Sequence, residues 1–218
     1  MRLQYPLDSI LGSVTNVRIL RFLCRKGGVW NGRRVASELG MSPVTAHKAL
    51  RKLHEATALD FKRVGNNFIY SLRDEHYLVR ALLRPLFSRE GQAYKRLQRL
   101  LQNTLSSRLR TQVISAAIYG SVATRRERPT SDIDLLILVP SEHEKQQARL
   151  VFEPLAQTLM KEFGNPLGLY VNTLREARGK LRRGLPIFQN ILTHHDLVWG
   201  KPLREALNGR QTSPNTTG

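Results

Sequence analysis

The sequence predicts an α+β protein made of two domains joined by a helical segment. Apolar residues recur at helical spacing through the first 56 residues and then alternate with polar residues over 59–73. Beyond residue 110, apolar runs of strand length alternate with helical stretches. The expected organisation is a first domain at 1–73, a helical linker or dimer helix at 74–110, a second domain at 111–207 and a disordered tail at 208–218.

Three helices are expected in the first domain. The first covers 15–25 and ends at two glycines, and the second covers 31–39. The third covers 43–56, because Ser42 is a good N-cap and Pro43 suits the first helical position. The residues of this helix expected to face the core are Val44, Leu50 and Leu53.

A β-hairpin is expected after these helices. The segment LDFKRVGNNFIYSLR alternates on both sides of a Gly-Asn-Asn turn. This order of elements resembles the winged helix-turn-helix domain of bacterial and archaeal transcription regulators. The resemblance implies binding to double-stranded DNA, with the third helix in the major groove and the hairpin, or wing, on the backbone. The residues it assigns to DNA binding are Ser42, Thr45, His47, Lys48, Arg51, Lys52, Arg63 and Asn66. Such domains also mediate protein contacts.

Residues 74–110 are expected to be helical, with Pro85 kinking or splitting the helix. Apolar residues then recur at steps of three and four, forming a stripe of Tyr94, Leu97, Leu100, Leu101 and Leu105. The stripe fits a connector packed on both domains, and it fits a homodimer surface equally well.

Strands and helices alternate in the second domain. The expected strands cover 113–119, 133–139 and 167–172, and the expected helices cover 142–163 and about 173–193, the last one beginning at Pro186. A short terminal element is expected at 196–200.

The most informative stretch is IYGSVATRRERPTSDIDLLILV, residues 118–139. Gly120 and Ser121 form a turn after one apolar run, and Asp132 and Asp134 stand where the next run begins. Because residues i and i+2 of an extended chain share a face, the two aspartates project together. Such carboxylates repel each other unless a cation lies between them, and oxygen-preferring Mg²⁺ suits the pair.

This motif resembles the signature of the nucleotidyltransferase superfamily that includes DNA polymerase beta, and it is closest to the minimal nucleotidyltransferase branch. The resemblance covers about 110–207 and implies a mixed sheet flanked by helices. It implies that the catalytic residues Asp132 and Asp134 hold Mg²⁺ or Mn²⁺ while a nucleotidyl group passes from a nucleoside triphosphate to a hydroxyl. The residues expected to bind the nucleotide are Gly120, Ser121, Arg125, Arg126 and Ser131. Glycine admits the phosphate, turn N–H groups donate to it, and guanidinium groups grip its oxygens.

The sequence departs from the superfamily pattern twice. The arginine and glycine that usually follow the Gly-Ser turn are replaced by Thr124 and Arg125, so Arg125 or Arg126 is expected to serve instead. The strand at 167–171 lacks the third carboxylate of the site, and Gly168 is the aligned position. Side chains with oxygen atoms near this strand in sequence are Glu162, Asn172, Glu176 and Asp196.

The charge of the chain is strongly positive and unevenly distributed. Lys and Arg number 35 against 17 Asp and Glu, and residues 1–110 hold 21 of the basic and 7 of the acidic ones. A basic first half attracts polyanions, most simply nucleic acid, with an anionic membrane surface as the competing partner. No apolar run approaches the length of a membrane span, and the single cysteine, Cys24, allows no internal disulfide. We therefore expect a soluble, cytoplasmic protein.

Three functional hypotheses agree with these features. The first is a DNA-binding nucleotidyltransferase that binds a nucleoside triphosphate with Mg²⁺ and transfers weakly, because one carboxylate is missing. The second is a transcriptional regulator whose nucleotidyltransferase-like domain is an inactive nucleotide sensor. The third is a transferase that docks a protein substrate through its winged helix. The sequence alone does not decide whether the chain is an enzyme.

Overall fold

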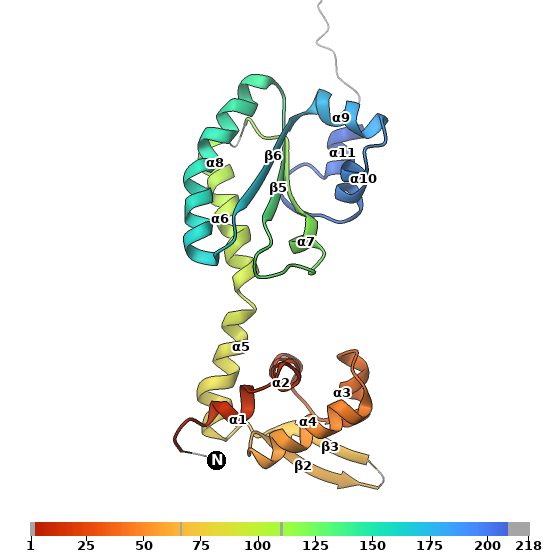
Figure 1. Ribbon diagram of the computed structural model, residues 1–218. Coiled ribbons are helices and arrows are strands. Elements are labelled where there is room, and N and C mark those ends of the chain that lie inside the picture. The colour runs from red at the N-terminus through yellow and green to blue at the C-terminus, as the bar shows by residue number, and fades with distance from the viewer. Residues whose placement is uncertain (1–2, 66, 110, 209–218) are drawn as a thin grey trace, which may run out of the picture. The chain divides into compact units, whose positions relative to one another are not determined.

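The computed structural model describes residues 3–65, 67–109 and 111–208, and the chain divides into two compact units, Met1–Ala93 and Tyr94–Gly218 (Figure 1). The expected DNA contact Asn66 and almost all of the expected disordered tail lie outside the described residues. Each unit has its own core of buried apolar side chains. The boundary falls inside the segment 74–110 that the sequence suggested as a linker.

The first unit is a winged helix. Its elements are α1 (Leu7–Leu11), α2 (Val14–Lys26), β1 (Trp30–Asn31), α3 (Gly32–Glu38), α4 (Pro43–Glu55), β2 (Leu59–Val64), β3 (Asn67–Leu72), the π-helix η1 (Leu78–Leu83) and α5 (Arg84–Glu90). The three strands form an antiparallel sheet in the order β1-β3-β2. Helix α4 begins as expected, because the Ser42 Oγ accepts the Thr45 N–H at 3.1 Å and Pro43 occupies the first turn.

Helix α4 turns one apolar face to the core of the first unit. Ala46, Ala49, Leu50 and Leu53 are buried, and they follow the spacing of a single helix face. The expectation that Val44 faces the core was wrong, since 78% of its surface is exposed. Val44 and Ala46 are two positions apart, which corresponds to about half a turn around the helix.

The segment 74–110 is divided between the two units. The π-helix η1 and α5 pack on the first core through Leu83 and Phe87, and Pro85 lies where the π-helix passes into α-helix. Helix α6 (Ala93–Arg108) belongs to the second unit, where Leu101 and Leu105 are fully buried. The apolar stripe therefore packs into the core of the second unit.

The second unit is a mixed sheet flanked by helices, as the sequence predicted. Its elements after α6 are β4 (Ser115–Tyr119), α7 (Gly120–Ala123), β5 (Ile133–Val139), α8 (Glu142–Phe163), β6 (Leu167–Thr173), α9 (Leu174–Arg182), α10 (Pro186–Thr193), β7 (Asp196–Gly200) and α11 (Leu203–Asn208). The strand order is β6-β5-β4-β7, in which β5 and β6 run parallel and the other pairs run antiparallel.

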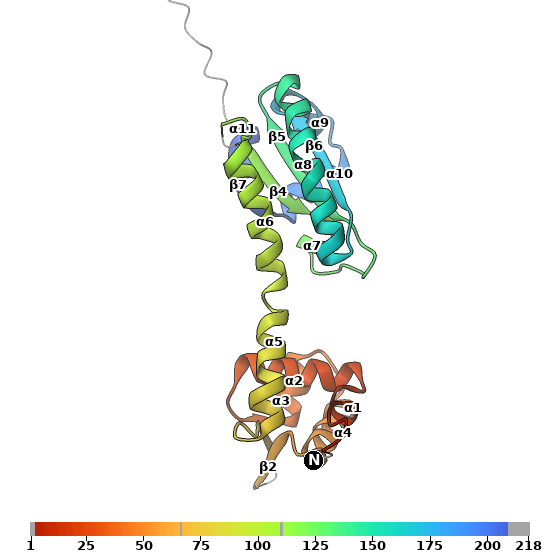
Figure 2. The same ribbon diagram turned by 90° about the vertical axis from the view of Figure 1, so that its left-hand side faces the viewer.

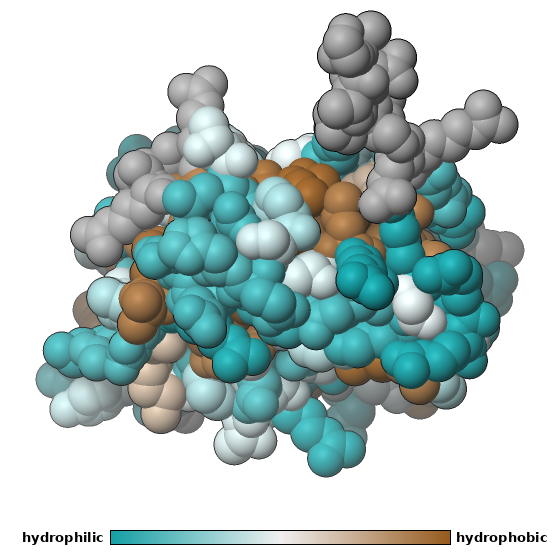
Figure 3. Space-filling model, turned by 90° about the horizontal axis from the view of Figure 1, so that it is seen from above, coloured by the Kyte–Doolittle hydropathy of each residue, from teal (hydrophilic) through white to brown (hydrophobic). Residues whose placement is uncertain are grey.

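Alternate residues of β5 face two separate cores. Leu135 and Ile137 pack against α6 and α8, whereas Leu136 and Leu138 pack against the side of α9, α10 and α11 (Figures 1 and 2). Asp134 shares its face with Leu136 and Leu138 because side chains alternate along a strand. The face of the molecule seen in Figure 3 is largely hydrophilic. Among the described residues, no helix combines the length and apolarity needed to span a membrane.

Candidate functional site

The turn after β4 faces Asp134. Strand β4 ends at Tyr119, and Gly120 begins the short helix α7 with a φ of +72°, a backbone conformation that favours glycine. A Cβ atom on Gly120 would lie 3.2 Å from the Asp134 Cγ and would overlap its Oδ2. The turn and the carboxylate therefore meet at a distance that only a glycine allows, as the motif requires.

Asp134 lies in the middle of three neighbouring strands, with Tyr119 of β4 on one side and Gly168 of β6 on the other. Its pKa is raised, first by burial and then by the negative charge of Asp132, which is itself exposed. Burial and the charge of Asp134 also raise the pKa of Tyr119 to about 12. No Lys or Arg among the described residues forms an ion pair with either aspartate. The site therefore holds excess negative charge in a partly desolvated position.

Gly168, the residue expected to align with the superfamily's third carboxylate, lies beside Asp134. It is the register partner of Asp134, and a Cβ atom added to it would lie 2.9 Å from the Asp134 Oδ1. A side chain at this position would therefore point to the same face as Asp134. The expected alignment of Gly168 with the missing carboxylate agrees with this register.

None of the other oxygen-bearing side chains replaces that carboxylate. Asn172 lies four residues further along β6, about 13 Å away at the usual rise of a strand, and its Oδ1 accepts the Lys180 ammonium at 2.5 Å. Glu162 pairs with Arg96, Glu176 pairs with Lys145, and Asp196 accepts the Tyr94 hydroxyl. All four are engaged away from Asp134.

A cavity of about 760 Å³ opens beside the turn. Its wall on the turn side includes Gly120, Arg125 and Arg126, and Arg125 holds a left-handed backbone with a φ of +56°. Such strained non-glycine residues concentrate at functional sites. Its other wall consists of Ile187, Asn190 and Ile191 of α10 and of His194, which follows the end of that helix. The volume lies in the range of small-molecule sites.

Only some of the five residues expected to bind the nucleotide line the cavity. Gly120, Arg125 and Arg126 line the cavity, and Ser121 lies in the first turn of α7. The Ser131 hydroxyl instead accepts the Arg128 N–H at 2.8 Å, which stabilises the loop before β5. The hydroxyl of Ser131 is thus already engaged in a turn.

The residues of α10 were missed at the sequence level. They begin 48 positions beyond the end of the motif, so local spacing could not connect them with it. Their own spacing of three and four residues marks one helix face and is the signal that could have found them. A helix face that carries apolar residues together with Asn and His would then have indicated the wall of a cavity.

The two aspartates suit a divalent cation of the magnesium type. Among the described residues no group of three or more His, Cys, Asp or Glu side chains comes together as a metal site. Mg²⁺ is commonly held by one or two carboxylates together with substrate phosphates. Asp132 and Asp134 therefore fit a cation that enters with a polyphosphate, rather than a cation held by protein alone.

The expected DNA-binding residues gather on one exposed surface of the first unit. Ser42, Thr45, His47, Lys48, Arg51 and Lys52 are all exposed along α4, and Arg63 is exposed on β2. The Arg51 guanidinium lies 3.2 Å from the Glu55 carboxylate, and Arg63 donates to the Gly65 carbonyl at 3.2 Å. This surface carries the position and the charge expected of a winged-helix recognition face.

Residues 100–177 match a family described as "Polymerase beta, Nucleotidyltransferase". No curated protein matches the chain. Similar solved structures include the AntR antimony-specific transcriptional repressor, at 26% identity over 41% of this chain and 78% of that one, with a TM-score of 0.35. NolR from Sinorhizobium fredii shares 20% identity over 39% and 82%, with a TM-score of 0.33. A mutant of the MntA-HpeT toxin–antitoxin pair shares 16% over 50% and 78%, with a TM-score of 0.33.

The TM-scores of these solved structures are too low to support an assignment by themselves. The match over 100–177 spans α6 to α9, and it includes the Gly-Ser turn and both aspartates. The first unit shows the winged-helix architecture in its own helices and hairpin. Residues 100–177 therefore match the polymerase beta nucleotidyltransferase family, and the unit that precedes them in the sequence has a winged-helix architecture.

Proposed function

We propose that the second unit binds a nucleoside triphosphate together with Mg²⁺ or Mn²⁺, and that the first unit binds double-stranded DNA. The observation that carries the proposal is the unpaired carboxylate of Asp134, wedged between Gly120 and Gly168 with Asp132 beside it. A partly buried anion without a partner is costly, and a cation that arrives with the nucleotide would reduce this cost.

Each residue of the site has a distinct role in this proposal. Asp132 and Asp134 hold the cation, which offsets negative charge on the phosphoryl oxygens when it is bound. Gly120 lets the backbone approach the phosphates, and Ser121 offers a hydroxyl donor. Arg125 and Arg126 reach the cavity beside the turn and suit phosphate oxygens through their forked guanidinium groups.

Transfer is expected to be weak. The acceptor hydroxyl must lose its proton while its oxygen bonds to the α-phosphorus and pyrophosphate leaves. Gly168 offers neither a base for that proton nor a third anionic ligand next to Asp134. General bases typically contribute about 10²- to 10⁴-fold to a rate, so the absence of one is a large loss.

Gly168 also favours a second candidate function. A domain that holds the nucleotide but lacks the third carboxylate suits a regulator that senses a nucleotide without consuming it. A transfer assay with α-labelled nucleotide separates the two functions, because the sensor releases no pyrophosphate at a rate above that of Asp132→Ala.

Calorimetric titration tests nucleotide binding. Each of the four NTPs is titrated with Mg²⁺ into the parent chain, into Asp134→Asn and into the control Glu162→Gln. Glu162 lies on α8 and forms an ion pair with Arg96 of α6, on the face of the sheet opposite Asp134. We expect heat of binding in the parent and the control, and a loss of at least tenfold in affinity for Asp134→Asn. Absence of binding for every nucleotide would refute the proposal.

Duplex binding over a series of salt concentrations tests the first unit. Phosphate contacts release counterions, so affinity should fall steeply as salt rises. Arg51→Ala should lower the salt slope by about one, as expected for the loss of one phosphate contact. A chain without salt-dependent affinity for DNA would instead fit the alternative in which the winged helix docks a protein.

A further inference from the structure

A chain of aromatic rings extends from the core of the first unit out to its surface. The Phe61 ring lies 5.3 Å from Tyr70, 5.4 Å from His54 and 5.5 Å from Phe68, and the Phe68 ring lies 5.5 Å from His47. Tyr70 is buried, whereas Phe61 is 38% and Phe68 is 41% exposed. Two large aromatic rings thus end the series in contact with solvent.

The register of the hairpin places these rings beside the recognition helix. Phe61 pairs with Tyr70 and Arg63 pairs with Phe68, so all four side chains share the hairpin face next to α4 (Figure 1). Val64 belongs to the opposite face, although it is also exposed, at 57%. The exposed rings therefore lie on the same surface as the expected DNA contacts of α4.

Phe68 and His47 line a groove of about 810 Å³ between α4 and the hairpin. The cations of the groove are Arg33, Lys48 and Arg51, and the residues that line it include no carboxylate. Glu55 reaches only Arg51, at 3.2 Å on the exposed side of the helix. The groove thus combines an aromatic wall with a positively charged rim.

A complete duplex offers the aromatic rings no base face to stack on. In a duplex the base faces are stacked on one another, and a protein meets base edges, thymine methyl groups and phosphates. An unpaired base instead offers a free π-face, and single-strand binding proteins combine a positive groove with aromatic side chains that stack on such bases. The exposed Phe68 next to three cations satisfies both conditions.

We infer that this groove binds single-stranded DNA, with an unpaired base stacked on Phe68 and the phosphates on Lys48 and Arg51. The inference rests on the proposed DNA binding of the winged helix and specifies which form of DNA it prefers. We propose DNA as the ligand of the groove for two reasons. The groove is continuous with the expected DNA contacts of α4, and its cations are complementary to the negative charge of the phosphates.

Fluorescence anisotropy with the full chain tests the inference. The probes are a labelled DNA strand that cannot pair with itself, its duplex of the same length, and the RNA strand of the same sequence. We expect the DNA strand to bind at least tenfold more tightly than the duplex. Phe68→Leu keeps apolar bulk but removes the π-face, and it should weaken strand binding by about 5- to 150-fold without changing the salt slope. Phe68→Tyr should restore it.

Val64→Ala is the matched control, because it removes an exposed apolar side chain from the other face of the same hairpin. It should bind the strand like the parent. Circular dichroism of each variant verifies that the fold is retained. Equal or tighter duplex binding, tighter RNA binding, or an unaffected Phe68→Leu would each overturn the inference while leaving DNA binding intact. Failure to bind any of the three probes would instead refute the DNA-binding proposal itself.

Discussion

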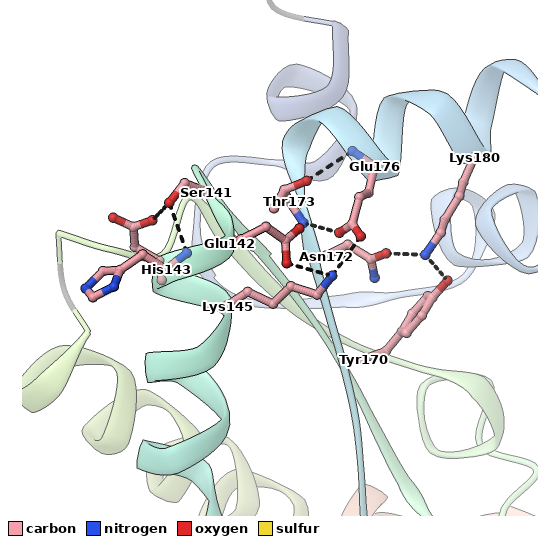
Figure 4. A network of polar contacts seen from close by, with 10 residues as sticks. Ser141, Glu142, His143, Lys145, Tyr170, Asn172, Thr173, Glu176 and Lys180 are labelled. Carbon is pink, nitrogen blue, oxygen red and sulfur yellow. Dashed lines mark hydrogen bonds and ion pairs between the residues drawn. The ribbon is translucent and has the colours of Figure 1, made fainter.

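The charged groups at the two ends of the parallel strands β5 and β6 differ in whether they have a partner. At the end where the strands begin, Asp134 stands between two glycines with a second carboxylate beside it and no cation paired with it among the described residues. At the end where they finish, every charged group drawn in the network of Figure 4 has a partner. The difference separates charges that are paired within the fold from charges that the fold leaves unpaired.

At the end where the strands finish, ion pairs and hydrogen bonds hold α8 and α9 against the sheet. The Lys145 ammonium of α8 lies 2.7 Å from the Glu176 carboxylate of α9. Glu176 and Thr173 form a capping box, in which the Thr173 N–H donates to the carboxylate at 2.8 Å and the Glu176 N–H donates to the Thr173 hydroxyl at 3.1 Å. Lys180 donates to Asn172 and to the Tyr170 hydroxyl. As a result the pKa of Glu176 is lowered and that of Lys145 is raised.

The largest expected effect comes from supplying the missing carboxylate. Gly168→Asp should raise the rate of nucleotidyl transfer by about 10²-fold, because the new side chain offers a base and a third anionic ligand beside Asp134. It should also tighten Mn²⁺ binding measured by calorimetry. Its Cβ atom meets the Asp134 Oδ1 at 2.9 Å, so some loss of stability is expected, and the unfolding transition must be measured in parallel.

Gly179→Asp is the control for this gain of function. Gly179 lies on α9 and has open space around the position of a Cβ atom. The Gly179→Asp substitution adds the same charge to the same unit at a distance from the turn, and it should leave the rate of nucleotidyl transfer unchanged. A folded Gly168→Asp protein that transfers no faster than this control would show that the absent carboxylate is not what limits the site.

The next largest effect concerns the paired end. Lys145→Met should lower the free energy of unfolding by about 1–2 kcal/mol, because it leaves the partly buried Glu176 without its cation. Glu176 has a lowered pKa, so the stabilisation is present when it is ionised and is lost as pH falls through that pKa. Urea unfolding at pH 7 and at acidic pH measures both. Nucleotide binding should stay unchanged, and a parallel loss of it would contradict the separation of the two ends.

The smallest effect concerns Asp134, and it has the opposite sign. Asp134→Asn should raise the free energy of unfolding at pH 7 by about 0.5–1 kcal/mol, since it removes a partly buried charge that Asp132 repels. The folded pKa of Asp134 is raised, so the parent loses stability as pH rises from the unfolded value of about 3.9 through the folded one. Below that window both side chains are neutral and the difference should vanish. Equal stability of the parent and Asp134→Asn at every pH would mean that the ionised carboxylate of Asp134 does not destabilise the fold.

The sequence predicted the hairpin of the first unit, the strands β4, β5 and β6, the main helices and the motif, because each of them rests on local spacing, but it did not predict the short strand β1. The alignment of Gly168 with the missing carboxylate came from the family resemblance, whereas its pairing with Asp134 between parallel strands is visible only in the structure. The sequence missed the wall of α10, since Asn190 and His194 meet the turn only through the folding of the sheet. It also placed Val44 in the core, because a single apolar residue at a helix start does not reveal which face it occupies.

Diffraction from crystals soaked with ATP and Mn²⁺ tests the central claim most directly, because the anomalous signal locates the cation itself. We expect a manganese peak between the carboxylates of Asp132 and Asp134, with the triphosphate against Gly120 and no second cation next to Gly168. A nucleotide bound elsewhere, with both aspartates free of metal at saturating Mn²⁺, would contradict the claim.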